Sequence, residues 1–166
     1  MNIKVSGELS GIIEVLKKMA MFEVTLAELY SLCASTWKED SEFWLDIWKD
    51  EIRHTQFINR IMEVISKAPE RFEKGRPFNI FVIETTVSDI RNKIEKIKKG
   101  EIEKNSLLHI TSDLEKGYLE DRYSEIVTTE DVEYRTLMQK VVDDTGKHKE
   151  KIVQKIKETT TQRESR

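Results

Sequence analysis

One stretch constrains the fold of this chain more than any other, the segment WLDIWKDEIRHTQFINRIMEVI from Trp44 to Ile65. Its core-type residues recur at alternating steps of three and four positions, so they line one face of an α-helix. That face reads Trp44, Ile47, Glu51, His54, Ile58, Ile61 and Ile65. Ionisable side chains such as Glu51 and His54 are rarely buried unless they are paired or bind a metal. Because these two project from consecutive helical turns in one direction, they are suited to hold one metal ion together.

The composition supports long helices. The chain has 166 residues and a mass of 19.5 kDa, which is enough for one domain with a substantial core. It contains only 6 Gly and 2 Pro, and 36% of its residues are charged, which favours helices over sheets. We therefore predict an all-α protein, with a single domain over residues 1–166 and a flexible tail at about 159–166.

Charge, cysteine content and hydropathy exclude several classes of protein. The net charge of −3 comes from interspersed charges of both signs, so no nucleic-acid-binding surface is expected. Cys33 is the only cysteine, which excludes an intrachain disulfide and a cysteine-rich metal site. No apolar run reaches the roughly 18 to 20 residues of a membrane span, and the N-terminus lacks a signal-peptide pattern. The sequence thus predicts a cytoplasmic protein that binds neither membranes nor nucleic acid.

Three more segments carry the same helical periodicity, each with an ionisable residue in the middle of its main face. The expected helices span residues 9–37, 41–67, 101–127 and 129–159. In the first, the ionisable residue is Glu23, and Tyr30 follows two turns farther along the same face. In the third it is Glu115, on a face that continues through Tyr118, Arg122 and Ile126, and in the fourth it is His148. Each half of the chain therefore supplies one helix with a central glutamate and one with a central histidine.

A long connection separates the second and third helices. It contains Pro69, Gly75 and Pro77, followed by residues 80–98, which are expected to form one or two short helices. Gly100 should end this region. A connection of this length is required if the third helix starts at the same end of a bundle as the second. The fold prediction is therefore a four-helix bundle whose long connection between helices 2 and 3 contains short helices.

A four-helix bundle places the middles of its helices at one level, so the ionisable side chains should converge. The predicted ligands are Glu23, Glu51, His54, Glu115 and His148. Carboxylates combined with imidazoles suit iron or manganese, as one ion or as two ions that share a bridging carboxylate. Tyr30 is either a functional residue near these ligands or a core aromatic, and His109 lies off the face and is expected at the surface.

At these residues the chain resembles the rubrerythrin-like branch of the ferritin-like family, over about residues 9–157. The resemblance rests on the motifs EVTLAELY from Glu23 to Tyr30, EIRH from Glu51 to His54, LEKGYLEDRY around Glu115, and DDTGKH ending at His148. It implies a di-iron site in which Glu51 bridges and the two histidines are terminal ligands. Glu23 and Glu115 would each be a terminal or a bridging ligand. Such proteins typically reduce peroxide, and other members oxidise or store iron.

Three departures from the family pattern limit this resemblance. The family's second Glu-x-x-His motif would place a glutamate where this chain has Thr145, and a hydroxyl cannot replace a bridging carboxylate. Asp144 either turns inward as a substitute metal ligand or lies on the solvent face. Rubrerythrins often carry a further glutamate at the position of Tyr118, and no Cys-x-x-Cys pair is present for a rubredoxin-like domain.

Two functions remain open from the sequence. The first is a metal-binding, rubrerythrin-like oxidoreductase that acts on peroxide or oxygen, with Tyr30 supplying protons or electrons. The resemblance implies a separate electron donor and a homodimer for such a protein. The alternative is a degenerate ferritin-like bundle without dimetal chemistry, which serves as a binding or structural module. In that case the same side chains form a hydrogen-bonded polar core.

Overall fold

The computed structural model describes residues 7–116 and 120–164, and within them the chain is all-α apart from two short strands. The α-helices are α1 (Gly7–Thr36), α2 (Ser41–Lys67), α3 (Ile80–Lys98), α4 (Lys104–Glu115) and α5 (Val132–Glu164). The 3₁₀ helices are η1 (Lys38–Asp40), η2 (Pro69–Arg71) and η3 (Glu120–Glu125), and the strands are β1 (Glu73–Lys74) and β2 (Val127–Thr128). This confirms the prediction of an all-α fold.

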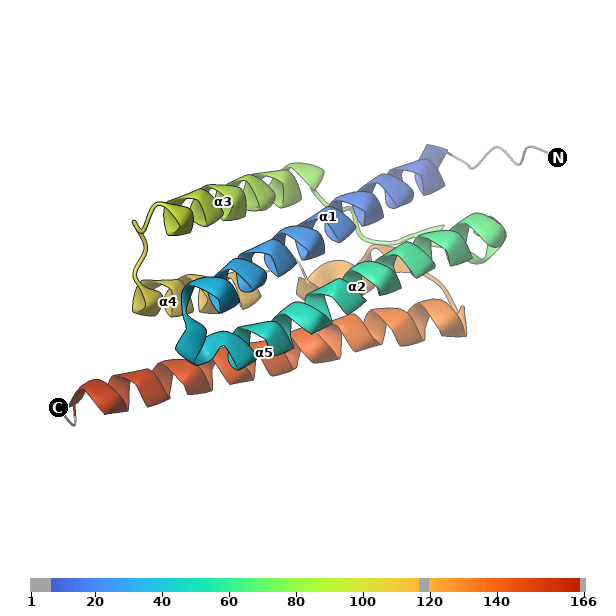
Figure 1. Ribbon diagram of the computed structural model, residues 1–166. Helices are drawn as coiled ribbons and strands as arrows, with labels where there is room; N and C mark the ends of the chain where they lie inside the picture. Colours follow the sequence, from blue (N-terminus) through green and yellow to red (C-terminus); the bar gives the residue numbers. More distant parts are fainter. Residues whose placement is uncertain (1–6, 117–119, 165–166) are drawn as a thin grey trace.

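The long helices lie side by side (Figure 1). α1 and α2 form an antiparallel pair, because the short η1 between them leaves room only for a reversal of the chain. α3 packs against α1, while α5 packs against α2, α4 and η3. None of the described helices is both long and apolar enough to cross a membrane.

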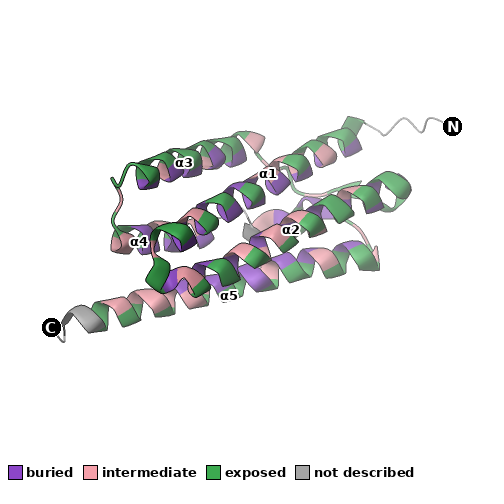
Figure 2. Cartoon of the chain, in the orientation of Figure 1, coloured by how far each residue is buried: buried purple, intermediate pink, exposed green. Residues whose placement is uncertain are grey.

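The buried faces agree closely with the periodicity of the sequence (Figure 2). All seven positions of the face predicted for α2 are buried, including Glu51 and His54. The face predicted for the first helix runs from Ile12 to Trp37. It is buried as far as Cys33, and only Trp37, one residue beyond α1, is half-exposed. A helix that presents one continuous apolar face must bury it against its neighbours, which explains the packing of α1, α2 and α5.

The connection between α2 and α4 contains one α-helix, α3, of 19 residues, after the short 3₁₀ helix η2. Asn79 begins it, because its side-chain oxygen accepts a hydrogen bond from the backbone amide of Phe81 at 3.0 Å. Gly100 ends it with a φ of 72°, a left-handed conformation that a residue without a Cβ adopts easily. The prediction of a helical connection terminated at Gly100 is confirmed.

The helix expected over residues 101–127 is wrong in its second half. α4 ends at Glu115, and the chain continues as η3 and β2. Tyr118, which was expected on the inner face of this helix, lies outside the described residues. Tyr123 and Ile126 are buried, whereas Arg122 of the expected face is only half-buried.

Backbone pairing explains why this segment is not helical. β2 runs antiparallel to β1, and Lys74 lies opposite Val127. Beyond the strands, the amide of Gly75 donates to the carbonyl of Ile126 at 3.0 Å, and the amide of Arg76 donates to that of Glu125 at 2.7 Å. Carbonyl groups used in this way are not available to a continuous helix.

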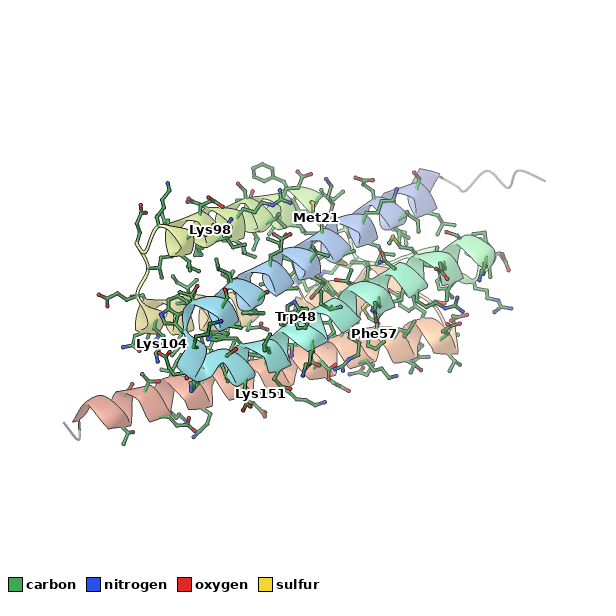
Figure 3. The ribbon with its side chains drawn as sticks, in the orientation of Figure 1. Met21, Trp48, Phe57, Lys98, Lys104 and Lys151 are labelled. Atoms are coloured by element: carbon green, nitrogen blue, oxygen red, sulfur yellow. The ribbon has the colours of Figure 1, made fainter. Side chains whose placement is uncertain are left out.

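α5 starts at a well-formed cap and continues farther than expected. The Asp131 carboxylate accepts a hydrogen bond from the amide of Tyr134 at 2.9 Å, which satisfies a free donor of the first turn. The helix extends to Glu164, through most of the segment that the sequence analysis expected to be a flexible tail. Near the start of α2, Lys104 of α4 (Figure 3) and Lys155 of α5 both contact Asp40, at 2.9 and 2.6 Å. This ion cluster holds three helices together at one end.

We predict that Gly75→Ala destabilises the protein by about 1–3 kcal/mol, because a Cβ there would lie 2.3 Å from the carbonyl oxygen of Glu125. The obstacle is backbone, which cannot rotate away. Gly11→Ala is the matched control, since a Cβ at that exposed position of α1 meets nothing within 4 Å. The control should be more stable by up to about 1 kcal/mol through helix propensity. Urea denaturation measures both, and equal stability of the two variants would contradict the prediction.

Candidate metal centre

Five ionisable side chains from four helices meet in the core. They are Glu23 of α1, Glu51 and His54 of α2, Glu115 of α4 and His148 of α5. Each is at most 1% exposed. They form two groups of possible ligands, Glu23 with Glu51 and His54, and Glu51 with Glu115 and His148. Within each group the candidate ligand atoms lie within 4.8 Å of one another, and Glu51 belongs to both.

The first group surrounds the Nδ1 atom of His54. This atom lies 3.4 Å from Oε2 of Glu23 and 3.3 Å from Oε2 of Glu51. The helical spacing of α2 brings the glutamate and the histidine to one side, as the Glu-x-x-His pattern predicted. Glu23 reaches them from α1, because the α1–α2 hairpin aligns the middles of the two helices.

The second group surrounds the Nδ1 atom of His148. This atom lies 3.1 Å from Oε1 of Glu51 and 3.7 Å from Oε2 of Glu115. The two carboxylate oxygens of Glu51 are therefore divided between the groups, Oε2 toward His54 and Oε1 toward His148. The two imidazole rings stack with centroids 5.8 Å apart. Glu51 thus has the position of a carboxylate that could bridge two ions.

The polar atoms of this core are suited to a metal. Eight buried atoms have no hydrogen-bond partner among the described residues: Oε1 and Oε2 of Glu23 and of Glu51, Nδ1 and Nε2 of His54, Oε2 of Glu115, and Nδ1 of His148. A buried polar group without a partner costs free energy, so a native core seldom keeps several of them. Metal coordination would satisfy one of these atoms on each of Glu23, His54, Glu115 and His148, and both oxygens of Glu51, which belongs to both groups. The residues present therefore fit one or two metal ions.

The electrostatics of the core are dominated by mutual pairing. Burial alone would raise the pKa of Glu51, but His148 and His54 on either side outweigh it and hold that pKa below its usual range. Burial would lower the pKa of both histidines, yet the nearby carboxylates raise it, to about 10 for His54 and about 11 for His148.

The pKa values of Glu23 and Glu115 shift in the opposite direction from that of Glu51. Burial raises the pKa of Glu23 to about 8, and it also raises the pKa of Glu115. The core therefore holds protons near neutral pH. A metal ion requires neutral imidazole and ionised carboxylate, so its binding would displace those protons.

Asp144 lies near the first group but on the far side of the histidine. Its Oδ2 atom is 3.5 Å from Nε2 of His54, whereas the glutamates face Nδ1 of the same ring. Asp144 belongs to neither group of possible ligands. It is largely buried and also contacts Arg53 at 2.9 Å, so it does not lie free on the solvent face. Its position is that of a residue that orients a ligand histidine.

Thr145 lies on α5 three residues before His148, as Glu51 lies on α2 three residues before His54. Its side chain is buried, and its hydroxyl donates a hydrogen bond to the carbonyl of Val141 at 2.9 Å, within its own helix. Among the described residues, Glu51 is therefore the one carboxylate that belongs to both groups of possible ligands. This agrees with the departure noted in the sequence.

Two further residues, which were not predicted from the sequence, belong to this site. Asp50 contacts Nε2 of His148 at 3.0 Å, and Arg53 contacts both Asp50 and Asp144. Asp50 precedes His54 by four residues, as Asp144 precedes His148. That repeated spacing was a usable signal, because each aspartate reaches the histidine of the other helix. His109, expected at the surface, is exposed.

Tyr30 lies directly beside the second group. Its hydroxyl donates a short hydrogen bond to Oε1 of Glu115, and its ring stacks on Trp44 with centroids 5.8 Å apart. The residue is fully buried. The rings of Tyr30 and Trp44 thus close the site on this side. The Tyr30 hydroxyl holds one proton next to Glu115, a candidate ligand.

No family model, curated protein or solved structure matches this chain. The functional argument therefore rests on the geometry of the core.

We predict that Tyr30→Phe destabilises the protein by about 1–3 kcal/mol, because the buried Glu115 carboxylate loses a hydrogen bond while the ring is retained. Tyr134→Phe is the matched control. The Tyr134 hydroxyl is also buried but has no hydrogen-bond partner among the described residues, so its removal should be neutral or stabilising. Urea denaturation of the metal-free proteins gives both values. Equal losses in the two variants would contradict a specific role of the Tyr30–Glu115 contact.

Proposed function

We propose that this protein binds iron or manganese in its core, as one or two ions held by Glu23, Glu51, His54, Glu115 and His148. The observation that carries the proposal is the position of Glu51, whose two oxygens face two different histidines 3.3 and 3.1 Å away. Each histidine has a further glutamate beside it. This is the ligand chemistry of two adjacent ions that share a carboxylate.

We further propose that the fold is a ferritin-like bundle formed by α1, α2, α4 with the segment after it, and α5. Support comes from the distribution of ligands, because each of these four helices contributes to one central cluster. α3 lies in the long connection between α2 and α4, outside the cluster. Ferritin-like dimetal sites place their ligands on the same pattern of helices.

The reaction proposed for this site is reduction of peroxide or oxygen with electrons from a separate donor protein. The bound ions would supply the binding and reduction of the oxidant. Of the chain's own residues, Tyr30 holds a proton beside Glu115, and the aromatic pair of Tyr30 and Trp44 shields this side from water. As in the family that the sequence resembles, we propose that the protein acts as a homodimer.

A second candidate is a metal-free bundle that serves as a binding or structural module. One observation favours it: Thr145 turns its hydroxyl to its own helix, so the part of the site that the structure describes has three glutamates and no second bridging carboxylate. In that case the paired histidines and carboxylates would compensate one another by charge alone. Such a core remains acceptable only if its charges are balanced.

Metal stoichiometry after anaerobic loading with Fe²⁺ or Mn²⁺ tests the proposal. We expect up to two ions per chain in the natural protein and loss of both in Glu51→Ala, since Glu51 belongs to both groups. Glu63→Ala is the matched control, because Glu63 lies on the same helix with a side chain 58% exposed. One ion per chain would indicate a mononuclear site. No ion in the natural protein would leave only the metal-free module.

Loading should also stabilise the protein, because the ions satisfy buried atoms that are otherwise unpaired. At a free metal concentration 1,000-fold above Kd the gain is about 4 kcal/mol, or roughly 8–16 °C in Tm for a chain of this size. Calorimetry with and without metal measures the shift. An equal shift in Glu51→Ala would show that the ions bind elsewhere.

We predict that Thr145→Glu increases metal affinity by at least about tenfold, because it places a second carboxylate three residues before His148. Thr145→Gln is the matched control, with nearly the same shape and no charge. Competition with a chelator measures the affinity of each variant. An equal affinity for the glutamate and glutamine variants would mean that a carboxylate at this position does not reach the ions.

A further inference from the structure

We propose that Arg53 is a positioning residue that holds both histidines of the core at once, by fixing the aspartate behind each of them. The proposal deepens the proposed metal function, on which its consequences for metal binding rest. Arg53 itself contacts neither group of possible ligands. It acts through Asp50 and Asp144.

A chain of contacts leads from Arg53 to each histidine. The Nη2 atom of Arg53 donates a short hydrogen bond to Oδ1 of Asp50, and the other oxygen of Asp50 lies 3.0 Å from Nε2 of His148. The same Nη2 atom lies 2.9 Å from Oδ2 of Asp144, and that oxygen is 3.5 Å from Nε2 of His54. One guanidinium nitrogen therefore links the two histidines from outside.

The arrangement crosses between helices. Asp50 and His54 belong to α2, and Asp144 and His148 belong to α5. Each aspartate contacts the histidine of the opposite helix, and Arg53 of α2 contacts an aspartate on each. These polar contacts thus join α2 to α5 beside the candidate ligands.

Removal of the Arg53 charge should release both aspartates. The two carboxylates contact the same nitrogen, so without a cation between them they repel each other. Both aspartate side chains are partly exposed, at 17% and 13%, so each can turn toward water. Asp144 keeps a contact with Lys147 at 3.1 Å, which should make the change at His54 smaller than that at His148. Loss of the partner behind a metal-binding histidine typically weakens metal affinity by about 10- to 100-fold.

Arg53→Met and Lys151→Met form a matched pair for the test. Both remove one positive charge from the α2–α5 surface, and both side chains are nearly half exposed, at 46% and 40%, so both variants should fold. Lys151 (Figure 3) pairs with Asp46, which contacts neither histidine through any hydrogen bond or ion pair between described residues. The control therefore separates a specific link from a general change in charge.

The first measurement needs no metal. In protein labelled with ¹⁵N-histidine, NMR resolves the imidazole nitrogens of all three histidines, and exposed His109 serves as an internal reference. Arg53→Met should shift the Nε2 signals of both His54 and His148 and leave His109 unchanged. Lys151→Met should leave His54 and His109 unchanged and shift His148 less than Arg53→Met does, because Asp46 acts on His148 only through its charge. A shift confined to one core histidine, or equal shifts in the control, would overturn the proposal.

The second measurement is metal affinity by chelator competition with Co²⁺, followed by its visible spectrum. Arg53→Met should weaken binding of both ions by about 10- to 100-fold and alter the spectrum, while Lys151→Met should match the natural protein. Natural affinity for either ion in Arg53→Met would contradict the proposal. If the natural protein binds no metal, the proposed function fails, and the NMR measurement still decides whether Arg53 holds both histidines.

Discussion

The structure depends on the burial of one carboxylate between two imidazoles. An isolated charge in an apolar core is strongly unfavourable, so Glu51 can be fully buried only because His54 and His148 flank it. This pairing determines how α2 and α5 are aligned along their axes. Glu23 and Glu115 bring α1 and the end of α4 to the same level. The apolar faces above and below the site supply the burial energy, and the polar centre sets their alignment.

The core has an approximate internal symmetry that one residue breaks. Each half contributes a glutamate on one helix and, on another, an aspartate four residues before a histidine. Glu51 has no counterpart, because Thr145 stands in the equivalent place and bonds to its own helix. With three carboxylates, two divalent ions would retain a net positive charge. The balance between metal binding and a purely structural core therefore depends on this position.

Polar contacts form a second layer around the five candidate ligands. Asp50 contacts the outward nitrogen of His148 at 3.0 Å, Asp144 lies 3.5 Å from the outward nitrogen of His54, and Arg53 contacts both aspartates. Such contacts set which ring nitrogen faces inward, and here the inward atom is Nδ1 in both histidines. These contacts lie between the buried core and the solvent, and Arg53 is half-exposed. Substitutions at the surface can therefore alter this part of the site.

The sequence by itself determined that four helices carry the core, which of their positions are buried, and the five central side chains, because an α-helical period of 3.6 residues shows directly which positions share a face. Only the tertiary structure decided how α4 ends, since the pairing of β1 with β2 and the close approach at Gly75 join segments distant in the chain. It likewise decided that Asp144 faces the outer nitrogen of His54, and that Asp50 and Arg53 complete the site. These contacts join α2 to α5, about 90 residues apart, and periodicity within one helix carries no information about its partner.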